Sequence, residues 1–214
     1  MWSQELLTSL EHSRIVAVVI LDREQDAVPT ARALARGGIS HMEPTLRTAA
    51  APAALEAIIR EVPEMTVGAG TVLSEEQVAH VSEIGVHFAV APGFNPVVAA
   101  AAAKVGLSFA PGVATPSDIE AAYSHGCRVL KLFPATPLGG PAFLKSVNAA
   151  YRHLGLRFIP TGGVTADTMA DWLALPEVLA VGGSWLAPAD LIRDGNWDEI
   201  ERRAKDAVAR GTGR

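Results

Sequence analysis

The sequence predicts an α/β protein, a single (β/α)8 TIM barrel spanning residues 1–214 with an extra helix at the N-terminus. Short apolar, β-branched runs recur along the chain, each followed by a stretch with helical spacing, and their starts lie 20 to 29 residues apart. That distance fits one strand, one helix and two turns. The runs also lack strict alternation of apolar and polar residues, which is typical of parallel strands covered on both faces.

Eight such runs are expected to be the strands, and the segments between them are expected to be helices. The segment "AVPTARALARGG" illustrates the helical pattern, because Val28, Ala31 and Leu34 share one face and a glycine follows. A doubly wound open sheet is the structural alternative, and eight evenly spaced units favour the barrel. The runs begin at Ile15, Ile39, Met65, His87, Leu107, Arg128, Arg157 and Val178.

Two further helices are expected at the ends of the chain. The first runs from Ser3 to about His12, with Leu6, Leu7 and Leu10 on its inward face, and the last is "WDEIERRAKDAVAR". No linker or break in composition divides the chain between them, so one domain is predicted.

Composition limits the classes of function. Of the 214 residues, 49% are hydrophobic and 19% are charged, and the formal net charge is -5. The basic residues are scattered, so no nucleic-acid-binding face is expected, and the most apolar segment, "VVAAAAAKVG", is too short to span a membrane. The single cysteine, Cys127, permits no internal disulfide and fits a reducing cytoplasm, and a small core residue is favoured over a nucleophile.

The segment "RVLKLFPAT" places Lys131 inside an apolar predicted strand, although lysine is rarely buried unless it is paired or has a chemical role. Strand alternation puts Lys131 on one face with Phe133, and Glu43 on one face with Thr45 and Arg47. If both faces point inward, Lys131 and Glu43 meet inside the barrel. Burial disfavours the ammonium form, and the neutral amine can attack a carbonyl while Glu43 transfers protons. The alternative is a buried ion pair without chemistry.

More polar and glycine residues end the predicted strands, where the active sites of such barrels lie. Arg47 has a planar fork suited to a substrate carboxylate, and a surface arginine or a salt bridge with Glu43 is the alternative. The turns "TGGVT" and "GGSWL", each expected to open towards a helix N-terminus, are typical of a phosphate site. The remaining strand-end candidates are Thr71, Pro92, Phe133, Thr161, Gly162, Gly163, Gly183 and Ser184.

No metal site is expected, because the six histidines show no ligand spacing with one another or with acids. His41 has the strand parity of Glu43 but lies two residues deeper. A hydrogen-bonded core histidine is therefore favoured over a catalytic one.

Seven motifs in order resemble the bacterial 2-keto-3-deoxy-6-phosphogluconate (KDPG) aldolases, also described as 4-hydroxy-2-oxoglutarate aldolases. The resemblance covers nearly the whole chain and implies a homotrimeric (β/α)8 barrel that uses a Schiff-base lysine and neither a metal nor a cofactor. The substrate it implies is a 2-keto sugar-acid phosphate. The motifs are "GGISHMEPTLRT", "VGAGTVL", "FAVAPGFNP", "FAPGVATPSDI", "LKLFPA", "FIPTGGVT" and "VGGSWL".

The resemblance also implies roles for individual residues. Lys131 would form the Schiff base, and Glu43 would be the general acid and base. Three groups of residues would bind the substrate: Arg47 and Thr71, with Thr161 nearby, at the carboxylate end of the pyruvyl unit; Pro92 and Phe133 around the imine; and Gly162, Gly163, Gly183 and Ser184 at the phosphate.

Three positions depart from the family pattern. Pro44 stands where valine or isoleucine is usual and removes a ladder donor beside Glu43. Thr136 replaces a common acid, and Ile20 replaces a common arginine. Substrate preference among the gluconate-, galactonate- and oxoglutarate-derived acids is therefore open, and "TLRT" and "PTGG" favour the gluconate-derived substrate.

Two rival functions remain at this stage. A sugar-phosphate epimerase or isomerase would also use the glycine turns, but it would need no nucleophilic amine. A barrel that binds a keto acid or phosphate without turnover would not require Lys131 and Glu43.

Overall fold

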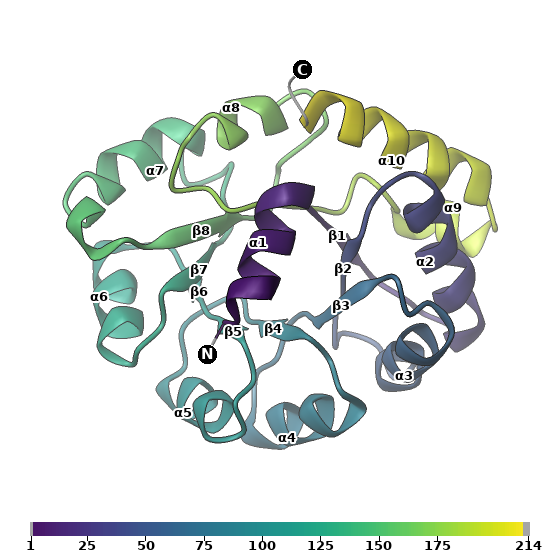
Figure 1. Cartoon of the computed structure of the whole chain (residues 1–214), viewed down its shortest axis with the longest axis horizontal. Coiled ribbons are helices and arrows are strands. Elements are labelled where there is room, and N and C mark those ends of the chain that lie inside the picture. The colour runs from purple at the N-terminus through teal and green to yellow at the C-terminus, as the bar shows by residue number, and fades with distance from the viewer. Residues whose placement is uncertain (1, 212–214) are drawn as a thin grey trace.

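A computed structural model describes residues 2–211 of the protein. It is an α/β fold in which helices surround the parallel strands (Figure 1). The strands are β1 (Ile15–Val19), β2 (His41–Pro44), β3 (Thr66–Ala69), β4 (Phe88–Val90), β5 (Phe109–Ala110), β6 (Gly112–Val113), β7 (Val129–Leu132), β8 (Arg157–Pro160) and β9 (Val181–Gly183). The helices are α1 (Gln4–Ser13), α2 (Ala27–Arg36), α3 (Ala51–Glu61), α4 (Glu75–Ile84), α5 (Pro96–Lys104), α6 (Pro116–Ser124), α7 (Gly140–Asn148), α8 (Met169–Leu173), α9 (Ala189–Arg193) and α10 (Trp197–Gly211), with 3-10 turns η1 (Glu24–Asp26) and η2 (Arg152–Leu154).

The strands form two parallel sheets, with the orders β5-β4-β3-β2-β1-β9 and β6-β7-β8. Parallel bridges pair Phe158 with Val178 and Thr161 with Gly182, so β8 lies beside β9. β5 and β6 are two parts of one predicted strand. Pro111 separates them, and it has no backbone N–H to donate to a ladder.

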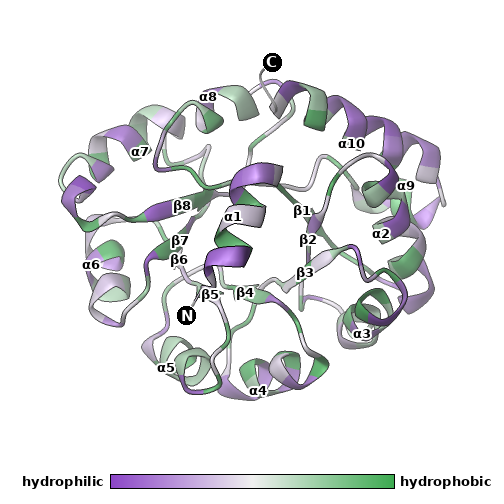
Figure 2. Cartoon of the chain, viewed as in Figure 1, coloured by the Kyte–Doolittle hydropathy of each residue, from purple (hydrophilic) through white to green (hydrophobic). Residues whose placement is uncertain are grey.

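Alternation along the strands separates an inner face from an outer face. An inner cluster of apolar side chains includes Val16, Phe88, Val90, Val129 and Ile159. The residues between them along the strands pack outward against the surrounding helices in a larger cluster. Figure 2 shows hydrophobic residues along the strands and hydrophilic ones on the outer helices, most clearly on α10.

Helix α1 lies across one end of the strands (Figure 1). The Ser3 hydroxyl accepts a hydrogen bond from the Leu6 backbone N–H at 3.1 Å and caps the helix. Leu6 and Leu10 belong to the inner cluster, and Leu7 packs against it. The helix therefore covers the inner face with the three leucines that its sequence spacing places together.

A hydrogen-bonded histidine joins α1 to the inner face. His41 is fully buried, its Nε2 lies 3.1 Å from the Ser9 hydroxyl, and its Nδ1 lies 3.0 Å from the Ser40 hydroxyl. Burial, with a smaller effect of His87, lowers the pKa of His41 to about 4. The predicted core histidine is thus a polar link between helix and strand.

The pKa of His41 predicts a loss of stability in acid. Because the unfolded chain binds the proton near pH 6.5 and the folded chain only near 4, stability that is present above pH 6.5 should fall through that interval. We expect the loss to reach about 3 kcal/mol at pH 4. Urea unfolding of the wild type and of His41→Gln at several pH values measures it. If the free energy of unfolding depended on pH equally in the two proteins, the loss of stability in acid would not arise from His41.

Candidate active site

Lys131 and Glu43 form a buried ion pair between two strands of different sheets. Lys131 lies on β7 and Glu43 on β2, 88 positions apart in sequence, and Lys131 Nζ lies 2.8 Å from Glu43 Oε1. Their side chains are only 7% and 2% exposed. The strand parity explains the meeting, because Val129, two residues before Lys131, belongs to the inner cluster, whereas Met42, beside Glu43, packs outward. Truncating one member of such a pair costs about 3–5 kcal/mol.

Gly70, just after β3, makes room for this pair. A side chain there would place its first carbon 2.4 Å from Glu43 Oε1, so any residue larger than glycine would displace the Glu43 side chain. The sequence reasoning selected the neighbouring Thr71 and missed Gly70. The available signal was a glycine inside a strand pattern, which often marks the close approach of another group.

Pro44 does not disturb the position of Glu43. Its carbonyl accepts from the Gly70 N–H at 2.9 Å, and the Thr45 N–H donates to the Val19 carbonyl at 2.9 Å. The ladder on both sides of β2 therefore continues past the proline. Although Pro44 has no backbone N–H to donate, the Glu43 side chain still points inward.

Two candidates lie on the loops that follow β2 and β3. The Arg47 side chain is exposed, and Glu43 pairs with Lys131 rather than with Arg47. Thr71 has a φ of 62°, which is uncommon for any residue other than glycine and costs about 1–3 kcal/mol. Such backbone strain concentrates at functional sites.

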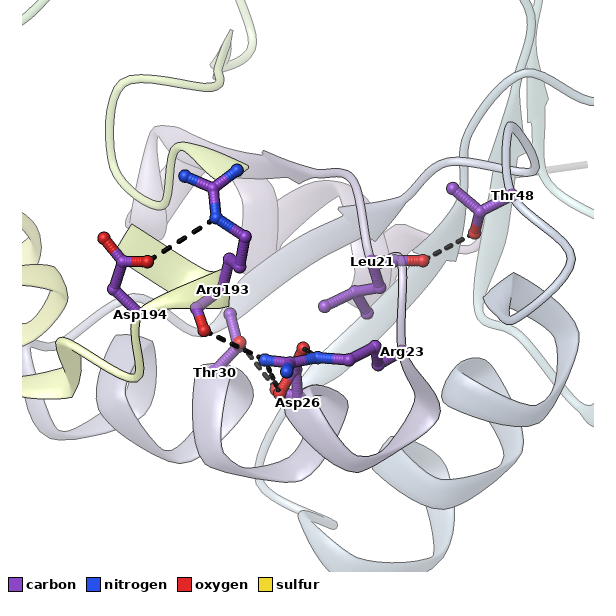
Figure 3. Close-up of polar contacts among 7 residues, drawn as sticks. All are labelled: Leu21, Arg23, Asp26, Thr30, Thr48, Arg193 and Asp194. Carbon is purple, nitrogen blue, oxygen red and sulfur yellow. Dashed lines mark hydrogen bonds and ion pairs between the residues drawn. The ribbon is translucent and has the colours of Figure 1, made fainter. Parts of the chain in front are cut away.

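The segment after Arg47 is tied to the neighbouring loop (Figure 3). The Thr48 hydroxyl donates to the carbonyl of the buried Leu21 at 2.5 Å. Beyond Leu21, the Arg23 guanidinium donates to both carboxylate oxygens of Asp26 at 2.7 and 3.0 Å and to the Arg193 carbonyl at 3.0 Å. These contacts hold the loops after β1 and β2 to each other and to α9.

Thr48→Val should destabilise the protein, because it removes the only donor that Thr48 offers to the Leu21 carbonyl. We expect a cost of about 1 kcal/mol, which lowers the Tm by about 2–4 °C. Thermal unfolding by circular dichroism measures the change. Thr48→Ser keeps the hydroxyl and is the matched control, and an unchanged Tm for the valine variant would show that the contact has no energetic weight.

Three further candidates, Thr161, Phe133 and Pro92, lie just after β8, β7 and β4. Thr161 is buried directly after β8, and Gly182 faces it so closely that an added side chain would come within 2.2 Å of its hydroxyl. Lys131 Nζ lies 5.9 Å from the centroid of the Phe133 ring. Pro92 is exposed, and its backbone packs against Gly112, where an added carbon would lie 2.1 Å from the Pro92 carbonyl.

Gly162 and Gly163 follow β8 with consecutive positive φ angles of 95° and 82°. An added side chain at Gly163 would also lie 2.6 Å from Thr136, so the residue that departs from the family pattern fills this space. At the end of β9, Gly183 packs against the Trp185 indole, and Ser184 is exposed.

The expected helix N-termini do not directly follow these glycine turns. α8 begins only at Met169 and α9 at Ala189, and each has five residues. The reason is that a turn at 165–168, where Thr165 N–H donates to the Thr168 hydroxyl, and the segment 184–188 intervene. The groups available to an anion are therefore backbone N–H groups of the turns and the Ser184 hydroxyl.

The third position that departs from the family pattern is half-buried. Ile20 directly follows β1 and shares the strand parity of the inward-facing Val16. It therefore places an apolar side chain at this border of the interior.

A cavity of about 280 Å³ lies elsewhere, where β5, β7 and β8 begin. Its lining includes Trp2, Phe109, Cys127 and Arg157, and the described residues around it include no acid and no lysine. It therefore lacks an acid–amine pair, and the interior around Lys131 is the candidate active site.

Residues 2–211 contain no group of three or more His, Cys, Asp or Glu side chains arranged to hold a metal ion. Over the same described range, no helix is both long and apolar enough to cross a membrane.

Comparisons with known proteins agree on one family. The sequence model of the KDPG and KHG aldolases matches residues 6–203. A 2-dehydro-3-deoxy-phosphogluconate aldolase of Treponema pallidum is 43% identical over 195 residues, which cover 91% of this chain and 92% of the relative.

Two solved structures have the same architecture. The KDPG aldolase of Zymomonas mobilis ZM4 with 3-phosphoglycerate superposes with a TM-score of 0.89 and 35% identity, covering 97% of each chain. The KDPG aldolase of Legionella pneumophila, with pyruvate captured as a covalent carbinolamine intermediate, gives a TM-score of 0.88 and 35% identity, covering 93% of this chain and 96% of that one.

Proposed function

The chain belongs to the KDPG and KHG aldolase family, and from this premise we propose how its residues cleave a 2-keto sugar acid. It is a class I aldolase that converts KDPG into pyruvate and glyceraldehyde 3-phosphate. The observation that carries this function is the buried pair of Lys131 and Glu43 at 2.8 Å. A sugar-phosphate epimerase or isomerase would have no use for an amine in that place, and a binding protein would need no acid beside it.

Lys131 is the nucleophile and Glu43 the proton-transfer group. Proton transfer along their hydrogen bond gives the neutral amine, which adds to the C2 ketone of the substrate. Glu43 returns that proton to the hydroxyl of the carbinolamine, which leaves as water, and the resulting iminium is an electron sink. Glu43 accepts the proton of the C4 hydroxyl, the C3–C4 bond breaks, and glyceraldehyde 3-phosphate leaves. Protonation of the enamine and hydrolysis release pyruvate and restore Lys131.

Other residues hold the two ends of the substrate. The exposed guanidinium of Arg47 and the strained Thr71 bind the pyruvyl carboxylate, with Thr161 nearby. Pro92 and Phe133 pack around the imine. The turns after β8 and β9 hold the phosphate through Gly162, Gly163, Gly183 and Ser184.

The architecture belongs to the same proposal. We infer one closed (β/α)8 barrel and one domain over residues 1–214, with α1 as the added helix. The bridges between β8 and β9 and the inner cluster support closure. Family membership favours a homotrimer, and, together with the single cysteine, it favours a cytoplasmic location.

The test is a coupled assay of pyruvate release from KDPG, compared in steady state with 4-hydroxy-2-oxoglutarate. We expect cleavage of both, with the higher kcat/KM for the phosphorylated acid because the glycine turns bind its phosphate. Release of no pyruvate from either acid by folded protein would contradict the function.

A further inference from the structure

The hydroxyl of Thr45, the residue that follows β2, is buried without a partner among residues 2–211. Thr45 is 4% exposed, and its Oγ1 makes no hydrogen bond with any residue in the range 2–211. Desolvating a hydroxyl without compensation is unfavourable, and a valine of the same shape would avoid the cost. An unpartnered hydroxyl inside a protein is therefore free to donate its hydrogen to a ligand.

Two other threonines, Thr30 and Thr48, show the usual solution. Thr30 donates to the Asp26 carbonyl at 2.6 Å, and Thr48 donates to the Leu21 carbonyl at 2.5 Å. Both hydroxyls are satisfied by the backbone. Thr45 has the same side chain and is buried, but its hydroxyl has no such partner.

The backbone directs Thr45 into the interior that holds the ion pair. The Thr45 N–H donates to the Val19 carbonyl, a parallel bridge pairs Thr45 with Gly70, and the Leu46 N–H donates to Gly70 at 2.8 Å. The strand geometry thus continues two residues beyond Glu43, so Thr45 shares its inward face. Two residues advance about 6.6 Å along a strand, which places Thr45 beyond Glu43 and just past the end of β2.

We propose that Thr45 binds the carboxylate of the 2-oxo acid by donating its hydroxyl hydrogen to one carboxylate oxygen. This inference rests on the proposed function, in which Lys131 bonds to C2 and Arg47 lies at the carboxylate end. Along the chain, Thr45 lies between Glu43 and Arg47, and its proposed contact is with the part of the substrate that joins the reacting carbon to that end. A carboxylate only accepts hydrogen bonds, and the free hydroxyl supplies a donor.

The experiment compares the wild type with Thr45→Val and Thr45→Ser. Three quantities are measured: the kinetics of KDPG cleavage, the affinity for pyruvate by calorimetry, and the Tm of the unliganded protein. Pyruvate has the carboxylate and the ketone but no C4 hydroxyl and no phosphate, so it locates the contact. Thr48→Val is the matched control, because it makes the same change at a hydroxyl that has a partner.

We expect Thr45→Val to weaken pyruvate binding and to raise the KM for KDPG by roughly 10- to 100-fold, with kcat changed by less than about threefold. Thr45→Ser should restore most of the affinity. The Tm of Thr45→Val should stay the same or rise by about 2–4 °C, whereas that of Thr48→Val should fall.

Two results would overturn the inference. Pyruvate affinity equal to that of the wild type in Thr45→Val would show that the hydroxyl does not meet the 2-oxo acid, whatever happens to cleavage. A fall in Tm as large as that of Thr48→Val would show that the hydroxyl has a structural partner. A wild type that binds pyruvate but cleaves no KDPG would contradict the proposed function alone, because the calorimetric comparison needs no turnover.

Discussion

Lys131→Ala should abolish KDPG cleavage, lowering kcat/KM by roughly 10⁴- to 10⁶-fold. Without the amine, no iminium forms, and breaking the C3–C4 bond would leave an anionic enolate instead of a neutral enamine. The measurement is pyruvate release in the coupled assay. Borohydride reduction in the presence of pyruvate should also leave a covalent adduct on Lys131 of the wild type, located by mass spectrometry of peptides, and no adduct on the variant.

Two controls separate chemistry from folding. Lys145 is exposed on α7, and Lys145→Ala should keep both the activity and the adduct. Lys131→Ala leaves Glu43 buried without its partner, so the double variant Lys131→Met, Glu43→Gln removes both charges and should recover stability while staying inactive. Full activity of Lys131→Ala, or an adduct on another lysine, would exclude the mechanism.

Glu43→Gln should lower kcat by roughly 10²- to 10⁴-fold, because the amide is close to the same size but cannot accept the C4 hydroxyl proton. The exchange of pyruvate methyl protons with solvent deuterium should slow in parallel, since it requires proton transfer at C3 of the enamine. Nuclear magnetic resonance follows that exchange without any sugar substrate.

Gly70→Ala provides an independent probe of the same carboxylate. Its added carbon would lie 2.4 Å from Glu43 Oε1, so Glu43 must move although its charge is kept. We expect kcat to fall in this variant as well. If Glu43→Gln exchanged the pyruvate methyl protons as fast as the wild type does, a group other than Glu43 would carry out the proton transfer.

The local sequence pattern was sufficient to predict the elements that surround the site. The spacing of Leu6, Leu7 and Leu10 indicated the inward face of the first helix, and all three pack on the inner cluster. A lysine inside an apolar run, with strand parity, was sufficient to bring Lys131 and Glu43 together across 88 positions. These inferences depend only on residue type and on the period of a helix or strand.

Other features of the site could not be predicted from the period of a helix or strand. Parity gives the face of Thr45 but not whether an acceptor lies near its hydroxyl. The space that Gly70 leaves for Glu43 depends on how closely two strands approach, and the start of α8 at Met169 depends on the turn before it.

By itself, therefore, the sequence determined the α/β class, the order of its units, the family and the candidate amine and acid, because each is encoded in short-range periodicity or in motifs. Only the tertiary structure decided that these two groups lie 2.8 Å apart and that Thr45 is unpartnered beside them. The physical reason is that hydrogen bonds depend on tenths of an ångström, and such distances arise only when segments distant in sequence pack together.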